Sequence, residues 1–295
     1  MVSVPHRLLS LPYVEVLHES LDLVIVHKRL TAPMIERPSC LTMHALSLVS
    51  QGRQVVYDQA GSRIRVDAGE GGLMRRDLYT VTDLLAGGTG DFVATVVFFS
   101  DGLVRRALAR SERGEAVRAS AATGLRHLQA APTFSTWPAH LAASARQLGP
   151  AADAAWFVEQ AEAFLAASVP DLGVLLERPR RSLREFMRAH YDKPLSVEDY
   201  AYLTGRSARS FRRDFAARFG ESPKRWLVAR RLERARELLR AGDVDSVNAA
   251  ASAVGYASTS HFIARYRERY GETPLKDRSV GRGNEVGAQH PRPLH

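Results

Sequence analysis

The sequence predicts a two-domain α+β protein, with a strand-rich domain and its helices in residues 1–170 and an all-helical domain in residues 182–280. Three observations lead to this prediction. Short apolar runs separated by glycine turns fill the first third of the chain. Stretches rich in Ala and Leu with helical spacing follow them. Near the C-terminus, one helix–turn–helix pattern occurs twice, about 50 residues apart.

The first 100 residues contain several strand signals. Residues 23–26 form a short apolar run, and residues 62–67 alternate between polar and apolar side chains. Residues 92–99 are almost continuously β-branched or aromatic, which indicates a strand buried on both faces. Many short strands joined by glycine turns are typical of a small barrel or sandwich.

Helices are expected in the rest of the first domain, over residues 101–168. Ser100 and Asp101 can cap the first of them. Three further stretches have helical spacing: 117–130, 136–148 and 152–167. Proline ends the last one, and residues 171–181 are expected to be a linker. These helices pack against the strands or provide a dimerisation face.

The second domain has clear helix boundaries. Ser182 begins a first helix, and Ser196-x-x-Asp199 resembles a capping box. A long amphipathic helix is expected over residues 223–240, where it would join the two repeats rigidly. The polar tail, residues 281–295, is expected to be disordered.

The repeat predicts two helix-turn-helix units. Its first copy contains Ala201-x-x-x-Gly205 and Phe219-Gly-Glu-x-Pro223, and its second contains the equivalent residues beginning at Ala251 and Tyr270. Residues 180–280 hold 22 lysines and arginines but only 13 aspartates and glutamates, whereas the rest of the chain is close to neutral. Basic charge on tandem units of this kind indicates binding to the phosphates of double-stranded DNA.

The first recognition helix is expected to start at Ser207. Three phenylalanines four residues apart would face inward: Phe211, Phe215 and Phe219. The opposite side presents Arg209, Ser210, Arg212 and Arg213. Arginine can donate two hydrogen bonds to guanine or bind phosphate. The alternative is that these arginines contact phosphates only, or form ion pairs with Asp214 and Glu221.

The second recognition helix is expected to start at Ser258, with Phe262, Tyr266 and Tyr270 facing inward. Its outward residues are Thr259, Ser260, His261, Ile263, Ala264 and Arg265. Hydroxyl and imidazole groups can bond to bases or phosphates, and apolar side chains can contact a thymine methyl group. This surface is less basic, so we expect it to discriminate less between sequences.

Residues 182–280 resemble the DNA-binding domain of the AraC/XylS transcription regulators. The resemblance rests on both Ala-x-x-x-Gly motifs, on Arg230-Arg-Leu-x-x-Ala-x-x-Leu-Leu239, and on Ser260-His-Phe262. It implies two helix-turn-helix units that enter successive major grooves on one face of promoter DNA, in a regulator that works with RNA polymerase and is an activator. The family has arginine where this chain has Ala264, and Arg265 follows one position later.

The N-terminal half resembles the cupin-like β-barrel that precedes this domain in the family and senses a signal or dimerises. Ser47-Leu-Val-x-x-Gly52 and Phe98-Phe-Ser-Asp101 are similar to the branch that contains the type III secretion master activators. In that branch a regulatory protein can replace a small-molecule effector. The effector, a homodimer and control by protein docking therefore all stay open at this point.

Other classes of function have little support in the sequence. Cys40 is the only cysteine, and His6, His18, His27 and His44 are scattered, so neither a metal site nor a cofactor is expected. No catalytic motif occurs, so an enzyme is the less favoured alternative. The chain shows neither a secretory signal nor a membrane span, and we expect a cytoplasmic protein.

Overall fold

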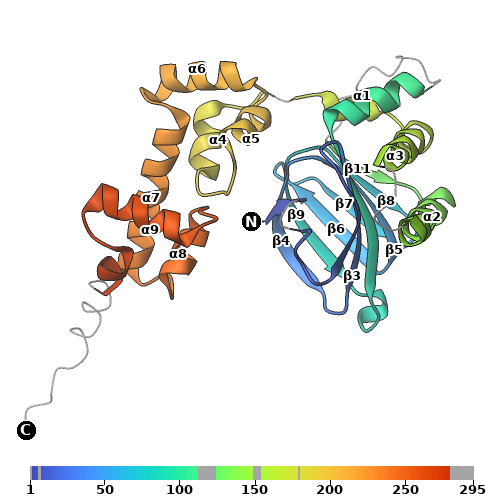
Figure 1. Ribbon diagram of the computed structural model, residues 1–295, viewed down its shortest axis with the longest axis horizontal. Helices are drawn as coiled ribbons and strands as arrows, with labels where there is room; N and C mark the ends of the chain where they lie inside the picture. Colours follow the sequence, from blue (N-terminus) through green and yellow to red (C-terminus); the bar gives the residue numbers. More distant parts are fainter. Residues whose placement is uncertain (1, 6–7, 112–123, 149–153, 179, 280–295) are drawn as a thin grey trace, which may run out of the picture. The chain divides into compact units, whose positions relative to one another are not determined.

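The computed structural model describes residues 2–5, 8–111, 124–148, 154–178 and 180–279 (Figure 1). The chain divides into two compact units, Met1–Arg178 and Pro179–His295, which we call the N-terminal and C-terminal units. The expected disorder of residues 281–295 concerns a segment outside the described residues. Within the described part of the chain, no helix is long and apolar enough to cross a membrane.

Two β-sheets form the N-terminal unit. The strands are β1 (Val2–Val4), β2 (Val14–Glu19), β3 (Leu23–Leu30), β4 (Met34–Leu41), β5 (His44–Gln51), β6 (Arg53–Asp58), β7 (Arg63–Asp67), β8 (Gly71–Met74), β9 (Leu78–Leu84), β10 (Phe92–Phe99) and β11 (Leu125–Leu128). One sheet has the order β1-β4-β9-β6-β7, and the other has β11-β8-β5-β10-β3-β2. The runs at 23–26, 62–67 and 92–99 are strands, as predicted.

The two sheets pack face to face rather than forming one closed barrel. Val26, Val56, Val96 and Phe98 belong to the apolar cluster between them. Closure requires the outer strands to pair, but the strand order of the described residues leaves β1 and β7 at the edges of one sheet and β2 and β11 at the edges of the other. The expected cupin-like β-barrel is therefore not closed in the described part of the chain, and its strands form two sheets, as in the sandwich that the sequence also allowed.

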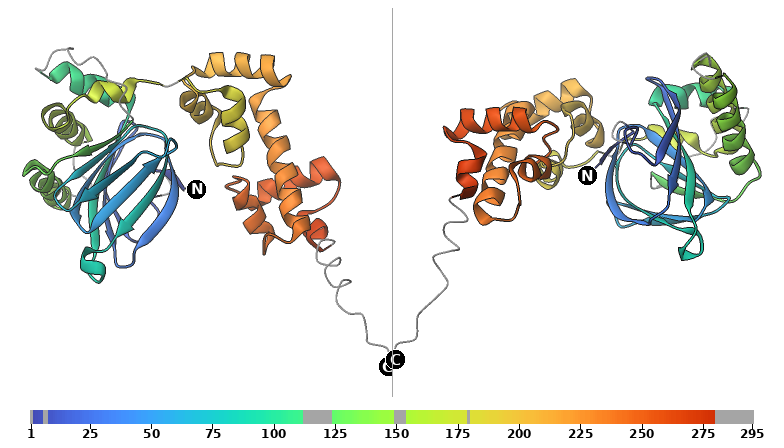
Figure 2. Two further views of the ribbon diagram at one scale, coloured as in Figure 1. Left: turned by 180° about the vertical axis from the view of Figure 1, so that it is seen from behind. Right: turned by 60° about the horizontal axis from the view of Figure 1, so that its bottom comes forward.

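Three helices cover the outer face of the six-stranded sheet (Figures 1 and 2). They are α1 (Asp101–Arg110), α2 (Thr133–Leu148) and α3 (Ala154–Ser168). Ile25, Leu46 and Val97 of the sheet share a buried cluster with Phe157 of α3. Ser100 caps α1, as predicted, by accepting a hydrogen bond from the backbone N–H of Leu103 at 3.2 Å.

The segment between α1 and α2 differs from the prediction. A helix was expected over residues 117–130, but residues 125–128 form β11, which pairs antiparallel with β8. The edge of β8 supplies the backbone partners for this short segment, and that tertiary pairing outweighs local helix propensity. Residues 117–123 lie outside the described residues.

A short 3-10 helix, η3 (Leu172–Leu176), follows α3. Leu172, Val174 and Leu175 are buried in the same cluster as the outer face of the sheet. Part of the segment expected to be a linker is therefore packed into the N-terminal unit.

Every element that Figure 1 labels in the C-terminal unit is a helix. Its helices are α4 (Leu183–His190), α5 (Val197–Leu203), α6 (Ala208–Phe219), α7 (Pro223–Ala241), α8 (Val247–Ala253) and α9 (Thr259–Tyr270), and residues 274–279 are also helical. The capping box at Ser196 and Asp199 is present. The buried side of α7 contains Leu227 and Leu232, as its amphipathic pattern predicts.

Candidate nucleic-acid interface

The two predicted recognition helices begin where the sequence indicates. Ser207 caps α6 by accepting a hydrogen bond from the backbone N–H of Ser210 at 3.1 Å. Ser258 caps α9 in the same way, from the N–H of His261 at 3.3 Å. Both helices have 12 residues, and a glycine with positive φ ends each of them. The two copies of the repeat therefore build two equivalent helices.

Buried aromatic side chains fix which face of each helix is exposed. Phe211 and Phe215 of α6 and Phe262 and Tyr266 of α9 are completely buried. Phe219 stacks on Phe215 with ring centroids 4.2 Å apart. Because one side of each helix is held in the core, the opposite side faces solvent, as predicted.

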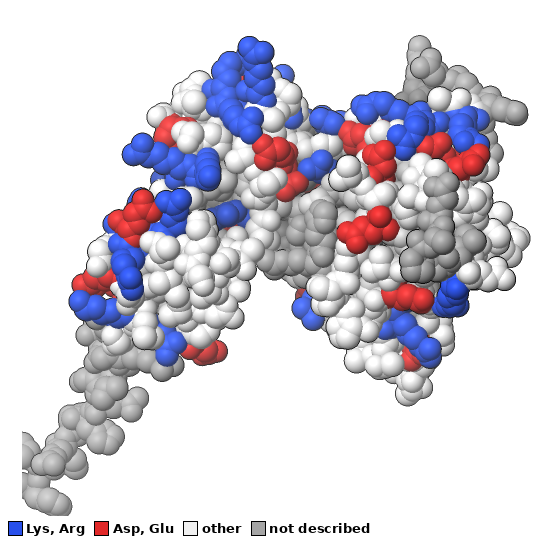
Figure 3. All heavy atoms as spheres, viewed as in Figure 1, with Lys and Arg blue, Asp and Glu red and all other residues white. Residues whose placement is uncertain are grey.

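The exposed face of α6 is basic, but its arginines differ in their partners. Arg212 forms an ion pair with Glu198 at 2.6 Å, and Arg213 forms one with Asp214 at 3.0 Å. Arg209 is exposed and has no ion pair among the described residues. Figure 3 shows lysine and arginine side chains gathered at the α6 end of the C-terminal unit. Arg209 is thus the arginine whose guanidinium group is free to contact DNA without first breaking an ion pair.

Unlike its exposed arginine neighbours, Ser210 takes part in the cap at the start of α6. Its backbone N–H donates to the cap at Ser207, and Ser207 Oγ lies 3.0 Å from Ser210 Oγ. The Ser210 side chain is half-buried in this local network. It supports the start of α6 as well as facing the candidate interface.

The exposed face of α9 is less charged, as expected. Ser260, His261 and Ala264 are exposed, whereas Ile263 is half-buried against the apolar core. Thr259 Oγ1 donates a hydrogen bond of 2.6 Å to Asn248 Oδ1. The last predicted residue, Arg265, forms an ion pair with Glu268 at 2.7 Å within the helix.

Two residues that the sequence analysis did not select contact the recognition helices from the helices before them. Glu198 of α5 bonds to Arg212, and Asn248 of α8 bonds to Thr259. Both residues are exposed. They occupy equivalent positions of the two repeats, three residues before Ala201 and Ala251. Aligning the two copies of the repeat from three residues before Ala201 and Ala251 would have identified both positions.

The backbone turn after α4 is contacted both by the connecting helix α7 and by the second helix-turn-helix unit. Arg231 of α7 donates a hydrogen bond from Nε to the carbonyl oxygen of Tyr191 at 2.7 Å and a second one to Lys193. Gly255, with φ of 81°, lies so close to the same turn that a Cβ atom there would be 2.7 Å from the carbonyl oxygen of Asp192. Glycine is required at this position for both reasons. The turn after α4 thus contacts both α7 and the turn between α8 and α9.

Residues 200–279 match a protein family described as a helix-turn-helix domain. The virulence regulon transcriptional activator VirF of Yersinia enterocolitica is 34% identical over 122 residues, which cover 41% of this chain and 43% of that protein. The transcriptional regulator ExsA of Pseudomonas aeruginosa is 34% identical over 104 residues, 35% of this chain and 37% of that protein. The chain thus matches less than half the length of either relative.

Solved structures with similarity to the chain include an AraC-type regulator from Chromobacterium violaceum, with 33% identity over 34% of this chain and 88% of that one, at a TM-score of 0.30. ToxT from Vibrio cholerae has 11% identity over 90% of this chain and 100% of that one, at a TM-score of 0.40. The family match defines the C-terminal unit as a helix-turn-helix domain. With the relatives named above, it is a domain of the AraC type, as the motifs indicated.

Proposed function

We propose that the protein is a sequence-specific transcription regulator, and an activator, which binds promoter DNA through α6 and α9. The observation that carries this proposal is the pair of equivalent, capped helices with exposed polar faces on a single helical unit. α7 connects them with 19 residues. At about 1.5 Å per residue its length is about 28 Å, close to one turn of B-DNA at about 34 Å.

The two helices would contribute unequally to the recognition of the DNA sequence. Arg209, Arg212 and Arg213 supply guanidinium groups for guanine edges or phosphates. On α9, Thr259, Ser260 and His261 offer hydrogen bonds, while Ile263 and Ala264 offer apolar contact, and Arg265 lies at the flank. Hydrogen bonds from arginine to guanine discriminate more strongly than apolar contacts, so α6 is expected to contribute most of the specificity.

Binding to a promoter duplex against a scrambled duplex, at physiological salt, tests the proposal. A specific site should bind about 10³-fold more tightly or better. Genome-wide mapping of bound sites supplies the duplex to use. Equal affinity for both duplexes would reject sequence-specific binding. The named relatives are regulators rather than enzymes, so no catalytic activity is included in the proposal.

The N-terminal unit would receive the signal, and one observation favours a small-molecule effector. A cavity of about 460 Å³ lies in this unit, lined mainly by apolar side chains such as Val96 and Phe98. Two polar atoms in its lining, Ser47 Oγ and Gln54 Oε1, are buried without a hydrogen-bond partner. Buried polar atoms of this kind usually have a partner. A ligand with an apolar body and a hydroxyl or amide group could satisfy both.

The alternative is control by a regulatory protein that docks on the N-terminal unit, with or without homodimerisation. Small-molecule stabilisation in a thermal-shift screen, lost in Ser47→Ala and Gln54→Ala variants, would support the effector. Co-purification of a protein partner without such stabilisation would support docking. In either case the regulator would act in the cytoplasm, and the resemblance implies that it works there with RNA polymerase.

A further inference from the structure

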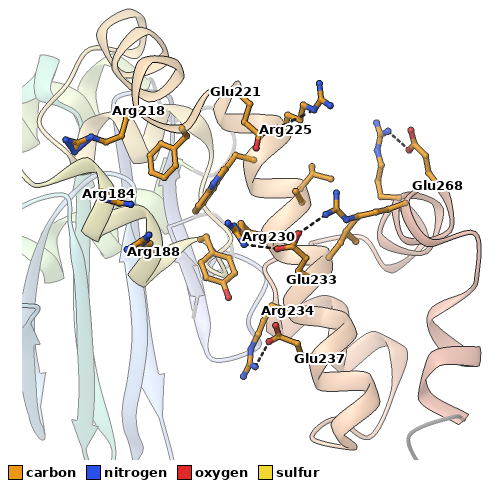
Figure 4. Close-up of a pocket in the computed structure, with 18 residues that line it drawn as sticks. Arg184, Arg188, Arg218, Glu221, Arg225, Arg230, Glu233, Arg234, Glu237 and Glu268 are labelled. Carbon is orange, nitrogen blue, oxygen red and sulfur yellow. Dashed lines mark hydrogen bonds and ion pairs between the residues drawn. The ribbon is translucent and has the colours of Figure 1, made fainter.

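A second charged surface lies in the C-terminal unit, in a cleft of about 1070 Å³ between α4, α7 and α9 (Figure 4). Eight arginines and four glutamates line it. We call it the arginine cleft and define its cationic wall by Arg184, Arg188 and Arg218, from α4 and the end of α6. The cleft is larger and more polar than the apolar pockets that hold small ligands.

The glutamates of the cleft do not neutralise it. Ion pairs at 2.7 to 3.7 Å join five of its arginines to the four glutamates, and Glu233 is shared by Arg230 and Arg269. The cationic wall, in contrast, has no ion pair among the described residues. Arginines outnumber glutamates by four. An uncompensated cluster of guanidinium groups recognises anions, above all carboxylates and phosphates.

Aromatic side chains lie among these charges. Trp226 contacts Phe219 at a centroid distance of 5.1 Å and Tyr191 at 6.2 Å, and the Arg230 guanidinium lies 5.7 Å from the Trp226 ring. Aromatic rings beside arginines suit an occupant that carries both acidic and apolar groups. A bare inorganic anion would use the charges alone and leave the exposed parts of Phe219 and Tyr191 in water.

Helix geometry directs the cleft away from the predicted DNA-contacting faces. Arg218 is three residues after buried Phe215 and therefore lies near the inward side of α6, whereas Arg213 is on the opposite side. On α9, Arg269 is likewise three residues after buried Tyr266. The helix α4, which carries Arg184 and Arg188, precedes both helix-turn-helix pairs. Arg265 also lines the cleft, so the cleft borders the predicted DNA-contacting face of α9 at this residue. The cationic wall lies outside the residues predicted to contact DNA, so it stays accessible while α6 and α9 face DNA.

We propose that the arginine cleft binds an acidic segment of a partner protein, one that contains aromatic or leucine side chains between its carboxylates. Carboxylates would pair with the cationic wall, and the apolar side chains would contact Phe219 and Tyr191, which are only half-buried in the cleft lining. The C-terminal unit then has two surfaces, one for DNA and one for protein, which meet at Arg265. The second surface does not depend on the DNA-binding proposal.

The test uses the full chain without DNA and a fluorescently labelled synthetic peptide rich in Asp and Glu with interspersed Leu and Phe. A second peptide replaces every Asp by Asn and every Glu by Gln. Fluorescence anisotropy at physiological ionic strength gives both affinities. The acidic peptide should bind, and Arg184→Glu with Arg188→Glu should weaken it about tenfold or more. Arg218→Glu should weaken it independently.

The matched control reverses two arginines of the N-terminal unit, Arg63→Glu with Arg105→Glu, which changes the net charge equally. Both residues are exposed, as are those of the cationic wall, so all variants should stay folded. Equal losses in the cleft and control variants would mean general charge attraction and would overturn the proposal. So would equal binding of the amide peptide. A cleft variant that loses DNA affinity but keeps the peptide would assign the cleft to DNA instead.

Discussion

The arginines of the two predicted recognition helices are not equivalent. Arg212 is held by a residue of the preceding helix, Arg213 and Arg265 by acidic neighbours on their own helices, and Arg209 by none that the structure describes. Exposed ion pairs contribute only about 0–1 kcal/mol, so DNA can replace them at small cost. The pair from Arg212 to Glu198 differs because it restricts the direction of the guanidinium group before DNA arrives.

Replacing Arg212 by alanine should weaken specific DNA binding by about 1–3 kcal/mol and relax the preference at one base pair, if this arginine contacts guanine. Competition between duplexes that each vary one base pair measures both effects. Arg63→Ala, in the N-terminal unit, is the control for lost charge. An equal loss of affinity for every duplex would assign Arg212 to phosphate.

Replacing Glu198 by glutamine should reduce selectivity more than affinity. The amide keeps the size of the side chain but loses the charge that orients Arg212, while one negative charge near the phosphates disappears. We expect the preference at the base pair contacted by Arg212 to fall by about 1 kcal/mol, with total affinity kept or raised. The same competition assay measures it, with Glu185→Gln of α4 as the control. An unchanged base preference would show that Glu198 has no orienting effect.

At the scale of elements, local signals predicted the helices of the C-terminal unit well. Caps such as Ser207 and Ser258 act within a few residues, so the sequence itself contains the information. The strand β11 was missed because a four-residue segment becomes a strand only through its pairing with β8. Glu198 was missed for a related reason, since its role depends on a side chain from another helix. The arginine cleft likewise needs three helices brought together.

A buried carboxylate connects the end of the C-terminal unit to its long helices. Asp277 is 1% exposed and accepts hydrogen bonds from Tyr266 Oη at 2.6 Å, Arg236 Nε at 3.1 Å and Arg240 Nε at 2.8 Å. Burial, together with the bond to Asp277, raises the pKa of Tyr266. Burial alone would raise the pKa of Asp277, but the bonds from Tyr266 and Arg240 hold it below its usual value.

Asp277→Ala should therefore destabilise the C-terminal unit by about 2 kcal/mol, since it leaves a buried hydroxyl and two guanidinium groups without their acceptor. Asp277→Asn keeps one acceptor oxygen and should cost less. Thermal and denaturant unfolding of the full chain measures both variants. A stability of Asp277→Ala equal to that of the unmodified chain would contradict this view of the contact.

A buried histidine of the N-terminal unit, His44, should make the stability of this unit depend on pH. His44 Nδ1 accepts from the backbone N–H of Arg76 at 3.1 Å, and Nε2 lies 3.0 Å from Asp101 Oδ1. Burial lowers the pKa of His44, and the bond to Asp101 opposes this only in part. Below a pH of about 6.5 the unfolded chain therefore binds a proton that the folded chain does not.

Stability should thus fall as the pH drops below about 6.5, by up to about 1.4 kcal/mol per pH unit for this one group. His44→Gln should make stability depend less steeply on pH. Part of the pH dependence should remain, because burial also lowers the pKa of His18 and His27. Asp101 titrates in a lower range because bonds from His44 and Arg178 lower its pKa. Denaturant unfolding from about pH 5 to about pH 8 measures the slope, with His140→Gln, an exposed site, as the control. Parallel slopes for the unmodified chain and His44→Gln would exclude His44 as the cause.

At the scale of the whole C-terminal unit, the decisive property is stiffness between the two recognition helices. α7 runs without a break over 19 residues from the end of the first helix-turn-helix pair to the start of the second. Gly255 of the second pair and Arg231 of α7 both contact the turn after α4, so this turn supports the second pair and the connecting helix together. A flexible tether would allow the helices to adapt to many spacings, whereas this arrangement allows one.

Inserting about five base pairs between the two contacted grooves should therefore reduce specific binding to nearly the level of nonspecific DNA, because the second groove turns to the opposite side of the duplex. Inserting about ten base pairs returns the second groove to the original side of the duplex but lengthens the distance between the grooves by about 34 Å. Since α7 cannot span this distance, affinity should stay low.

Gel-shift titration of the three duplexes measures this, and Gly255→Ala provides the matched variant. Its Cβ atom would meet the Asp192 carbonyl oxygen at 2.7 Å, so the contact between the two pairs must loosen. The variant should bind the original duplex more weakly and discriminate less between the three spacings. Equal affinity of the unmodified protein for all three duplexes would mean that only one recognition helix contacts DNA.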